Sequence, residues 1–121
     1  MRLSSVMIGT ADTQPLVEYY TKLFGEPRWQ DGTFAGWELG DGGVAVGPHD
    51  KVSGKNAHPG RVIWNIESAD VQADFARLRD AGGTVVLEPY EAGPGMWVAT
   101  FADPDDNYFQ LMSPMEPPPA G

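Results

Sequence analysis

Asp103-Pro104-Asp105-Asp106-Asn107-Tyr108-Phe109-Gln110-Leu111-Met112 is the stretch that decides the fold. Pro104 fixes φ and the Asp and Asn side chains hydrogen-bond their own backbone, so residues 103–107 predict a turn. The next five residues are aromatic and apolar except at Gln110, which predicts a buried closing strand. A polar side chain in such a strand completes a hydrogen-bond network or faces a cavity, so Gln110 is the first candidate site residue.

The chain before this stretch alternates strand and helix signals. A helix is predicted after Asp12 or Thr13, which offer an N-cap, and it ends at Gly25. A second helix is predicted after Asp70 and ends at Gly82 and Gly83. Period-2 patterns and turn signals predict strands at residues 2–9, 27–30, 34–39, 44–47, 61–67, 84–87, 96–101 and 108–112. Residues 48–60 have no period and predict a linker.

The same order of elements occurs twice. A shift of 58 residues places Ala11 and Asp12 on Ala69 and Asp70, and a shift of 64 places residues 41–44 on residues 105–108. We therefore expect one α+β domain of two βαβββ modules, related by a pseudo-two-fold, with curved mixed sheets around a cavity. The predicted division is module 1 at 1–48, the linker at 48–60, module 2 at 61–114 and a Pro-rich tail at 115–121.

Composition limits the function. The 121 residues contain no cysteine, which excludes disulfides and thiolate chemistry and fits a cytoplasmic protein. The net charge of −9 argues against nucleic acid and could attract a cationic small molecule. No apolar run reaches the roughly 20 residues of a membrane span, so no membrane association is expected.

Three segments carry a family resemblance: residues 6–12 with 19–25, residues 70–83, and the turn and strand from Asp103. Together they resemble the vicinal oxygen chelate superfamily, which includes glyoxalase I, bleomycin-resistance proteins and extradiol dioxygenases. The resemblance spans Leu3 to about Pro114 and is greatest to the short glyoxalase-like members. It implies a homodimer, in which the 13-residue linker permits swapped or unswapped modules.

Metal-dependent members of the superfamily hold a cation with His and Glu on the first and fourth strands of each module. The corresponding positions here are Ser5, Ala45 or Val46, Ile63 (or Val62 or Arg61) and Gln110. None is a His or a carboxylate, and a neutral Gln carbonyl replaces neither charge nor basicity, so no metal and no cofactor is predicted. His49 and His58 lie in the linker at no familiar ligand spacing, and we interpret both as solvated. Glu38 and Glu88 are lone strand carboxylates that we interpret as surface residues.

Apolar and polar side chains on the predicted inner strands suit an organic ligand better than an ion. The candidate ligand-binding residues are Ser5, Met7, Trp37, Arg61, Asn65, Trp97, Tyr108 and Gln110. Trp29 is a further possible wall of the cavity, whereas Trp64 alternates with Val62 and Ile66 and is predicted to pack under a helix.

The leading hypothesis is a metal-independent small-molecule-binding protein of the bleomycin-resistance type, with a cationic or aromatic ligand. The alternative is a glyoxalase-class lyase, isomerase or dioxygenase with a non-standard or absent metal site. A third possibility is a protein-interaction module, which a cavity filled by Trp37 and Trp97 would favour.

Overall fold

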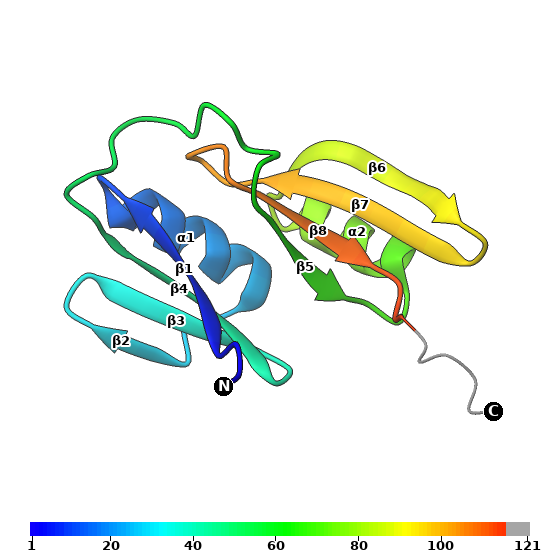
Figure 1. The fold of residues 1–121 in the computed structure, drawn as a ribbon, viewed down its shortest axis with the longest axis horizontal. Coiled ribbons are helices and arrows are strands. Elements are labelled where there is room, and N and C mark those ends of the chain that lie inside the picture. The colour runs from blue at the N-terminus through cyan, green and yellow to red at the C-terminus, as the bar shows by residue number, and fades with distance from the viewer. Residues whose placement is uncertain (116–121) are drawn as a thin grey trace.

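The computed structural model describes residues 1–115, and in them strand, helix and three strands occur twice (Figure 1). In chain order the elements are β1 (Ser5–Thr10), α1 (Thr13–Phe24), β2 (Trp29–Asp31), β3 (Phe34–Leu39), β4 (Gly42–Pro48), β5 (Ile63–Glu67), α2 (Val71–Asp80), β6 (Thr84–Gly93), β7 (Met96–Ala102) and β8 (Tyr108–Met112). The predicted order of elements is confirmed. The predicted Pro-rich tail lies, apart from Met115, outside the described residues.

Both helices begin at the caps that the sequence offers. The Asp12 carboxylate accepts from the backbone N–H of Gln14 at 3.3 Å, and the Asp70 carboxylate accepts from that of Ala73 at 3.0 Å. At the other end of α1, Gly25 has a φ of 89°, a left-handed conformation that a side chain would strain. The helix bounds therefore follow from local capping chemistry.

Several strands differ from prediction in their bounds. β1 begins at Ser5 rather than Arg2. β5 begins at Ile63 rather than Arg61, because the Arg61 N–H donates to the His58 carbonyl in a turn. β6 continues to Gly93 instead of ending at Leu87. Its pairing with β7 shifts register between Leu87 and Tyr90, which accommodates Pro89 on an edge strand.

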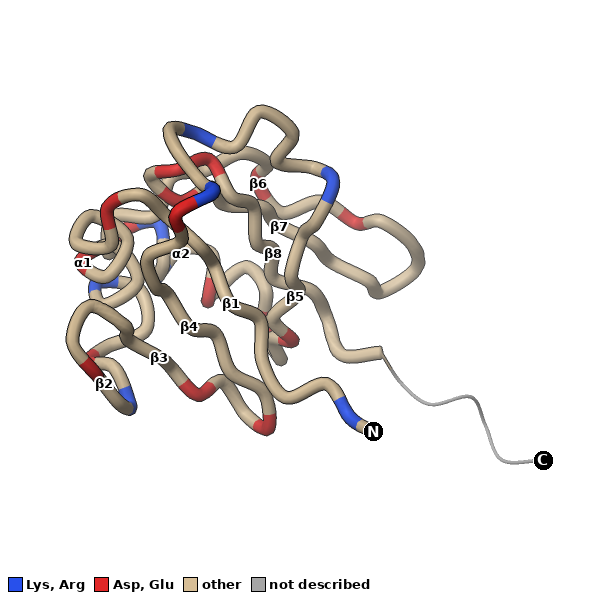
Figure 2. Tube along the Cα trace, turned by 60° about the vertical axis from the view of Figure 1, so that its left-hand side comes forward, with Lys and Arg blue, Asp and Glu red and all other residues tan. Residues whose placement is uncertain are grey.

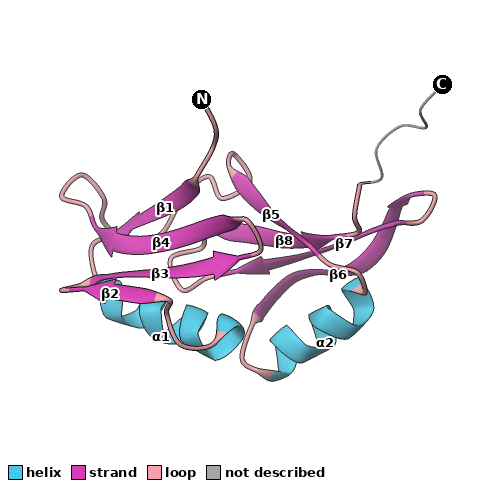
Figure 3. Ribbon diagram, turned by 90° about the horizontal axis from the view of Figure 1, so that it is seen from below, coloured by secondary structure: helices cyan, strands magenta, loops and turns pink. Residues whose placement is uncertain are grey.

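The strands form two four-stranded mixed sheets, in the orders β1-β4-β3-β2 and β5-β8-β7-β6. In each sheet the first strand of the module pairs parallel with the last, and the other pairings are antiparallel. Both helices lie on the same side of the two sheets (Figure 3). We call the opposite face of each sheet its open face.

The structure gives the register of the repeat. β5 begins 58 residues after β1 and α2 begins 58 residues after α1, as the sequence predicts. In the last strands, however, Ala45 pairs with Met7 whereas Gln110 pairs with Asn65, so equivalent residues lie 65 apart. The predicted shift of 64 is wrong by one residue, and in a strand such a slip exchanges the two faces.

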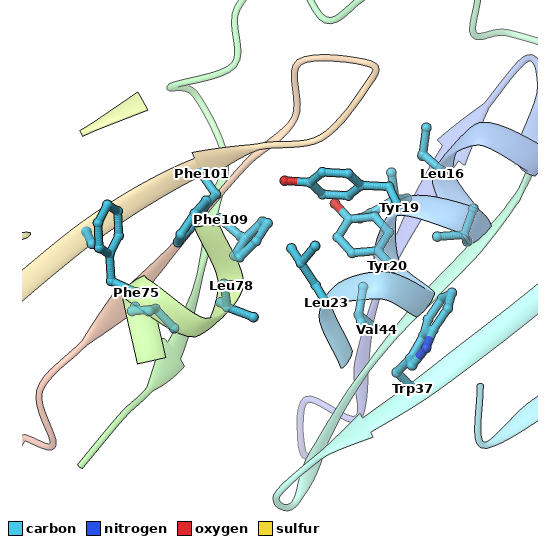
Figure 4. Close-up of a cluster of buried hydrophobic side chains, with 14 of the residues drawn as sticks. Leu16, Tyr19, Tyr20, Leu23, Trp37, Val44, Phe75, Leu78, Phe101 and Phe109 are labelled. Atoms are coloured by element: carbon cyan, nitrogen blue, oxygen red, sulfur yellow. The ribbon is translucent and has the colours of Figure 1, made fainter. Parts of the chain in front are cut away.

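One core joins the two modules (Figure 4). The Tyr20 ring of α1 lies 5.9 Å from Trp37 of β3 and 6.1 Å from Phe109 of β8, measured between ring centroids. Helix α1 therefore packs against its own sheet and against the sheet of the second module. Phe75 of α2 extends the cluster through Phe101 of β7, at 5.4 Å.

The turn before β8 is fastened to the first module through Asp103, which is 3% exposed. Its carboxylate accepts from the Tyr20 hydroxyl at 2.7 Å and from the backbone N–H groups of Asp105 and Asn107 at 2.9 Å. Burial raises the pKa of Asp103, and the hydrogen bonds from Tyr20 and from the turn oppose that shift.

The segment between β4 and β5 contains no helix or strand and crosses from one module to the other. The His49 N–H donates to the Thr10 carbonyl at 3.1 Å, next to the end of β1. Further along, the Asn56 N–H donates to the Asp105 carbonyl at 2.7 Å, in the turn before β8. The linker is thus bound to both modules at the same end of their sheets.

Acidic residues outnumber basic ones by 17 to 8 and occur on both modules (Figure 2). Within residues 1–115 no helix has the length and apolar character needed to cross a membrane.

Candidate functional site

The register of each sheet decides which side chains lie on its open face. In the first sheet the middle row of that face is Met7, Ala45, Gly36 and Trp29, one residue from each strand. The alternate residues, among them Ile8, Val46 and Trp37, are buried under α1. Ser5, Gly9, Gly43, Gly47, Phe34 and Glu38 occupy the neighbouring rows of the open face.

This open face has a floor of small residues on which large side chains lie. A Cβ atom at Gly36 would collide with the Trp29 indole, and one at Gly47 would collide with the Phe34 ring. The Met7 methyl group would be 3.1 Å from the Cβ at position 47. Glycine weakens a strand, and here it allows two rings to lie against the backbone. We call Met7, Phe34 and Trp29, with Gly36 and Gly47 beneath them, the apolar platform.

The platform is accessible. Met7 is 51% exposed, Trp29 47% and Phe34 39%, although all three are large and apolar. Such a cluster of exposed apolar side chains on a sheet indicates a surface for binding.

The linker borders the open face near Gly9. The His49 Cβ would be 3.0 Å from a Cβ atom at Gly9, and a Val52 methyl group 3.7 Å from it. A hollow of about 470 Å³ lies here, lined by Thr10, Ala11, Pro48, His49, Asp50 and Val52. His49 itself is half-exposed, and its Nδ1 accepts from the Lys51 N–H at 3.1 Å.

The open face of the second sheet has a polar middle row: Asn65, Gln110, Thr100 and Leu87, again one residue from each strand. The Thr100 hydroxyl donates to Gln110 Oε1 at 3.3 Å, and Gln110 Nε2 donates to Asn65 Oδ1 at 2.6 Å. We call Thr100, Gln110 and Asn65 the amide row. Tyr108 and Met112 flank Gln110 on the same face.

The structure brings together most of the residues that the sequence singled out. Ser5 and Met7 share the open face of the first sheet, and Asn65, Tyr108 and Gln110 share that of the second. Their binding of a ligand stays a prediction. Arg61 precedes β5 and is exposed, so its predicted place in the strand is wrong.

Two tryptophans among the candidates lie on the helix side of their sheets and not on the open faces. Trp37 is buried under α1, and its indole N–H donates to the Gly25 carbonyl at 2.8 Å. Trp97 alternates with Val98 onto the helix side of its sheet and packs against the core. Neither fills the open face, which removes the observation that would have favoured an interaction module. Trp64 packs against the core as predicted, with its ring 5.0 Å from Phe109.

Sequence reasoning missed Phe34 and Thr100 and left Trp29 undecided. The signal for the platform was the glycines inside strands, at positions 36 and 47, opposite aromatic residues. Thr100 could be placed only after the pairing of β7 with β8 was known.

The residues at the four metal positions do not fit a catalytic cation. On the open faces these positions hold Ser5, Ala45, Ile63 and Gln110, whereas Val46 points into the core. Catalytic divalent metals in proteins are held by imidazole, thiolate or carboxylate. Within residues 1–115 no three His, Cys, Asp or Glu side chains are grouped as such a site would require.

Comparison with known proteins identifies the family of this chain and relatives of its fold. Residues 5–112 match the family described as glyoxalase-like domain. No curated protein matches the sequence.

Among solved structures, a glyoxalase/bleomycin resistance protein from Catenulispora acidiphila DSM 44928 superposes with a TM-score of 0.74 at 17% identity, covering 94% of this chain and 100% of that one. A glyoxalase/bleomycin resistance protein/dioxygenase family enzyme from Burkholderia phytofirmans PsJN gives 0.72 at 21% identity, covering 95% and 100%. TioX from Micromonospora sp. ML1 gives 0.71 at 19% identity, also covering 95% and 100%. At such identities the likeness is one of fold.

Proposed function

This chain belongs to the glyoxalase-like domain family, and we propose that it is a metal-independent protein that binds a small planar aromatic molecule on the apolar platform. The single observation that carries the proposal is the placing of Trp29 and Phe34 on glycines in an exposed sheet face. Rings held flat and accessible offer a stacking surface to a planar ligand.

Metal independence is supported by the side chains at the four positions where metal-dependent members of the superfamily hold the cation. Ser5 and Gln110 are neutral, and Ala45 and Ile63 offer no donor atom. The protein has a net charge of −9, which favours a cationic or neutral ligand over an anionic one. We infer that the protein sequesters its ligand, since no group on the platform can act as acid, base or nucleophile.

The test is a binding panel of planar compounds, with 9-aminoacridine as the cationic probe and 2-naphthamide as the neutral one. Binding is followed by thermal shift and by the indole Nε1–H resonance of Trp29, assigned from the spectrum of Trp29→Phe. We expect saturable binding that moves this resonance, and mass spectrometry of the recovered probe should find it unchanged. A panel without any such binder, or turnover of a bound probe, contradicts the proposal.

A separate measurement tests metal independence. Elemental analysis of the purified protein should find no stoichiometric Zn, Ni, Fe or Mn. A stoichiometric metal that is lost in Gln110→Met would contradict it.

The homodimer implied by the family resemblance is part of the proposal. Size-exclusion chromatography with light scattering should give twice the chain mass of 13.1 kDa. A monomer at the concentrations of the binding assays would exclude the dimer without affecting the platform.

A further inference from the structure

The imidazole of His49 borders the apolar platform on the open face of the first sheet. Gly9 of β1 and Gly47 of β4 are register partners on that face. The Phe34 ring lies over Gly47, and His49 lies over Gly9, where its Cβ and Cγ would be 3.0 and 3.6 Å from a Cβ atom. His49 and Phe34 therefore cover neighbouring positions, about one strand spacing of 4.8 Å apart.

The rest of the platform is within reach of the same position. The Met7 side chain comes from β1 and its methyl group would be 3.1 Å from a Cβ atom at Gly47, beside the Phe34 ring. Gly36, under the Trp29 indole, is two strands from Gly9 and two residues along the sheet. The glycines beneath the rings thus span roughly 12 Å, which a bicyclic aromatic molecule with one substituent covers.

His49 is held in place by hydrogen bonds on three sides. Its backbone N–H donates to the Thr10 carbonyl at 3.1 Å, and its carbonyl accepts from the Val52 N–H at 3.2 Å. Its Nδ1 accepts from the Lys51 N–H at 3.1 Å. The side chain is therefore ordered before a ligand arrives, which lowers the entropy cost of binding to it.

The same hydrogen bonds decide what the imidazole can offer. Because Nδ1 accepts from Lys51, the neutral ring carries its hydrogen on Nε2. The Asp50 carboxylate is 3.8 Å from Nδ1, beyond hydrogen-bond distance. Nε2 has no hydrogen-bond partner among residues 1–115, and the side chain is 51% exposed. His49 thus presents one free N–H donor at the edge of the platform.

The hollow beside His49 selects the group that this donor meets. Its volume is about 470 Å³, and its lining residues include the carboxylate of Asp50 and no lysine or arginine. An anionic group would be opposed by that carboxylate and by the net charge of −9. A cation cannot accept a hydrogen bond. A neutral acceptor such as a carbonyl oxygen fits both the donor and the charge.

We propose that His49 determines the specificity of the site: the aromatic part of the ligand lies on the platform, and a neutral acceptor atom on it accepts from His49 Nε2. This assignment rests on the proposed function and adds the residue that recognises the polar group of the ligand. Since Nδ1 is occupied by Lys51, His49 donates without taking up a proton, which agrees with sequestration of an unchanged ligand.

Two probes of nearly equal shape test the assignment. 2-Acetylnaphthalene and 2-isopropenylnaphthalene share the ring system and differ only in a carbonyl oxygen against a methylene group. Calorimetric titration gives the ratio of their dissociation constants in each variant. Comparison of this ratio between variants cancels the difference in hydration of the two probes.

Two substitutions separate the two nitrogens of the imidazole. His49→Asn keeps an acceptor in the place of Nδ1 and removes the donor, so the ketone should weaken roughly 3- to 10-fold relative to the hydrocarbon, as for one neutral hydrogen bond. His49→Gln keeps an N–H near the place of Nε2 and loses the acceptor, and its ratio should stay close to that of the parent. The control is His58→Asn in the same linker, an exposed residue outside the lining of the hollow, which should leave the ratio unchanged.

The outcomes separate this assignment from the proposed function. If the ratio in His49→Asn equals that of the parent while both probes move the Trp29 indole resonance, the His49 assignment is overturned and the platform stands. Equal changes of the ratio in His49→Asn and His49→Gln, or a change in His58→Asn, also overturn it. If neither probe moves the Trp29 indole, the platform itself is wrong and the His49 assignment falls with it.

Discussion

The Tyr20 hydroxyl donates to the buried Asp103 carboxylate at 2.7 Å, across 83 residues of sequence. The first residue belongs to the helix of module 1 and the second to the turn that precedes β8. The bond connects the element that forms the centre of the core to the turn that positions Gln110. The amide row therefore depends on a contact between modules.

Tyr20→Phe should destabilise the protein in a pH-dependent way. Burial raises the pKa of Asp103, so its contribution to stability is fully present below the ordinary carboxyl pKa and is lost as pH rises through the raised pKa. The Tyr20 hydroxyl lowers that pKa. Without it the pKa rises further, and the loss continues to higher pH.

Urea unfolding of Tyr20→Phe should show a deficit of about 1.5–3 kcal/mol at neutral pH, as expected for a hydrogen bond to a charged group, and a smaller one near pH 4. Tyr19→Phe is the matched control, because the Tyr19 hydroxyl donates to the Ala102 carbonyl and not to a carboxylate. Its deficit should not vary over this range. Equal deficits for Tyr20→Phe at both pH values would contradict the coupling.

A second hydrogen bond between the modules predicts that substitution of the buried Thr10 destabilises the protein. The buried Thr10 hydroxyl donates to Asp105 Oδ2 at 2.6 Å and accepts from the Asp12 N–H at 3.2 Å. Thr10→Val should cost about 1–3 kcal/mol in urea unfolding, since it leaves both groups without their partner. Thr10→Ser keeps the hydroxyl and should retain most of the stability. If the two variants are equally destabilised, packing rather than the hydrogen bond is responsible.

The fold followed from the sequence because its signals are local. Asp12 and Asp70 cap helices, and the turn at Asp103 begins a strand whatever the rest of the chain does. Which residues of the two modules are equivalent depends on the pairing of their strands, which the sequence does not give. The predicted shift of 64 therefore aligned residues that lie on opposite faces of their sheets. A one-residue error in a strand reverses every assignment of side chains.

The site was less predictable for a related reason. Alternation separates the two faces of β3 but does not say which one meets the helix, so the sequence leaves Trp37 as a candidate for either the cavity or the core. Ala35 and Leu39 share its face, whereas Gly36 is on the other. The pairing of Gly36 with the aromatic Trp29 on the neighbouring strand is the pattern that indicates the platform.

The glycines beneath the platform predict a separation of binding from stability. Gly36→Ala should displace the exposed Trp29 ring rather than the backbone, and alanine suits a strand better than glycine. We expect stability within about 1 kcal/mol of the parent and a loss of 2-naphthamide affinity of roughly 3- to 10-fold, the worth of one aromatic contact. Titrations followed at the Trp29 indole resonance measure it.

Gly42→Ala is the control for this substitution. A Cβ atom there would meet only the Leu39 carbonyl, at 3.9 Å, and no ring. Affinity should be unchanged. An equal loss in both variants would mean that strand glycines affect binding through the backbone.

Two tryptophans on neighbouring strands of the same sheet should behave in opposite ways when replaced. Trp37 is 3% exposed, and its indole caps the carbonyl at the end of α1, so Trp37→Phe should cost about 2–4 kcal/mol of unfolding free energy. Trp29 lies on the open face, and Trp29→Ala should change stability by less than about 1 kcal/mol.

The affinity for 2-naphthamide should change in the opposite way. It should be retained in folded Trp37→Phe and reduced at least several-fold in Trp29→Ala. Chemical denaturation and calorimetric titration of 2-naphthamide on both variants decide the matter. Retained affinity in Trp29→Ala would place the ligand elsewhere, because no other exposed tryptophan lies on that face in the described part of the chain.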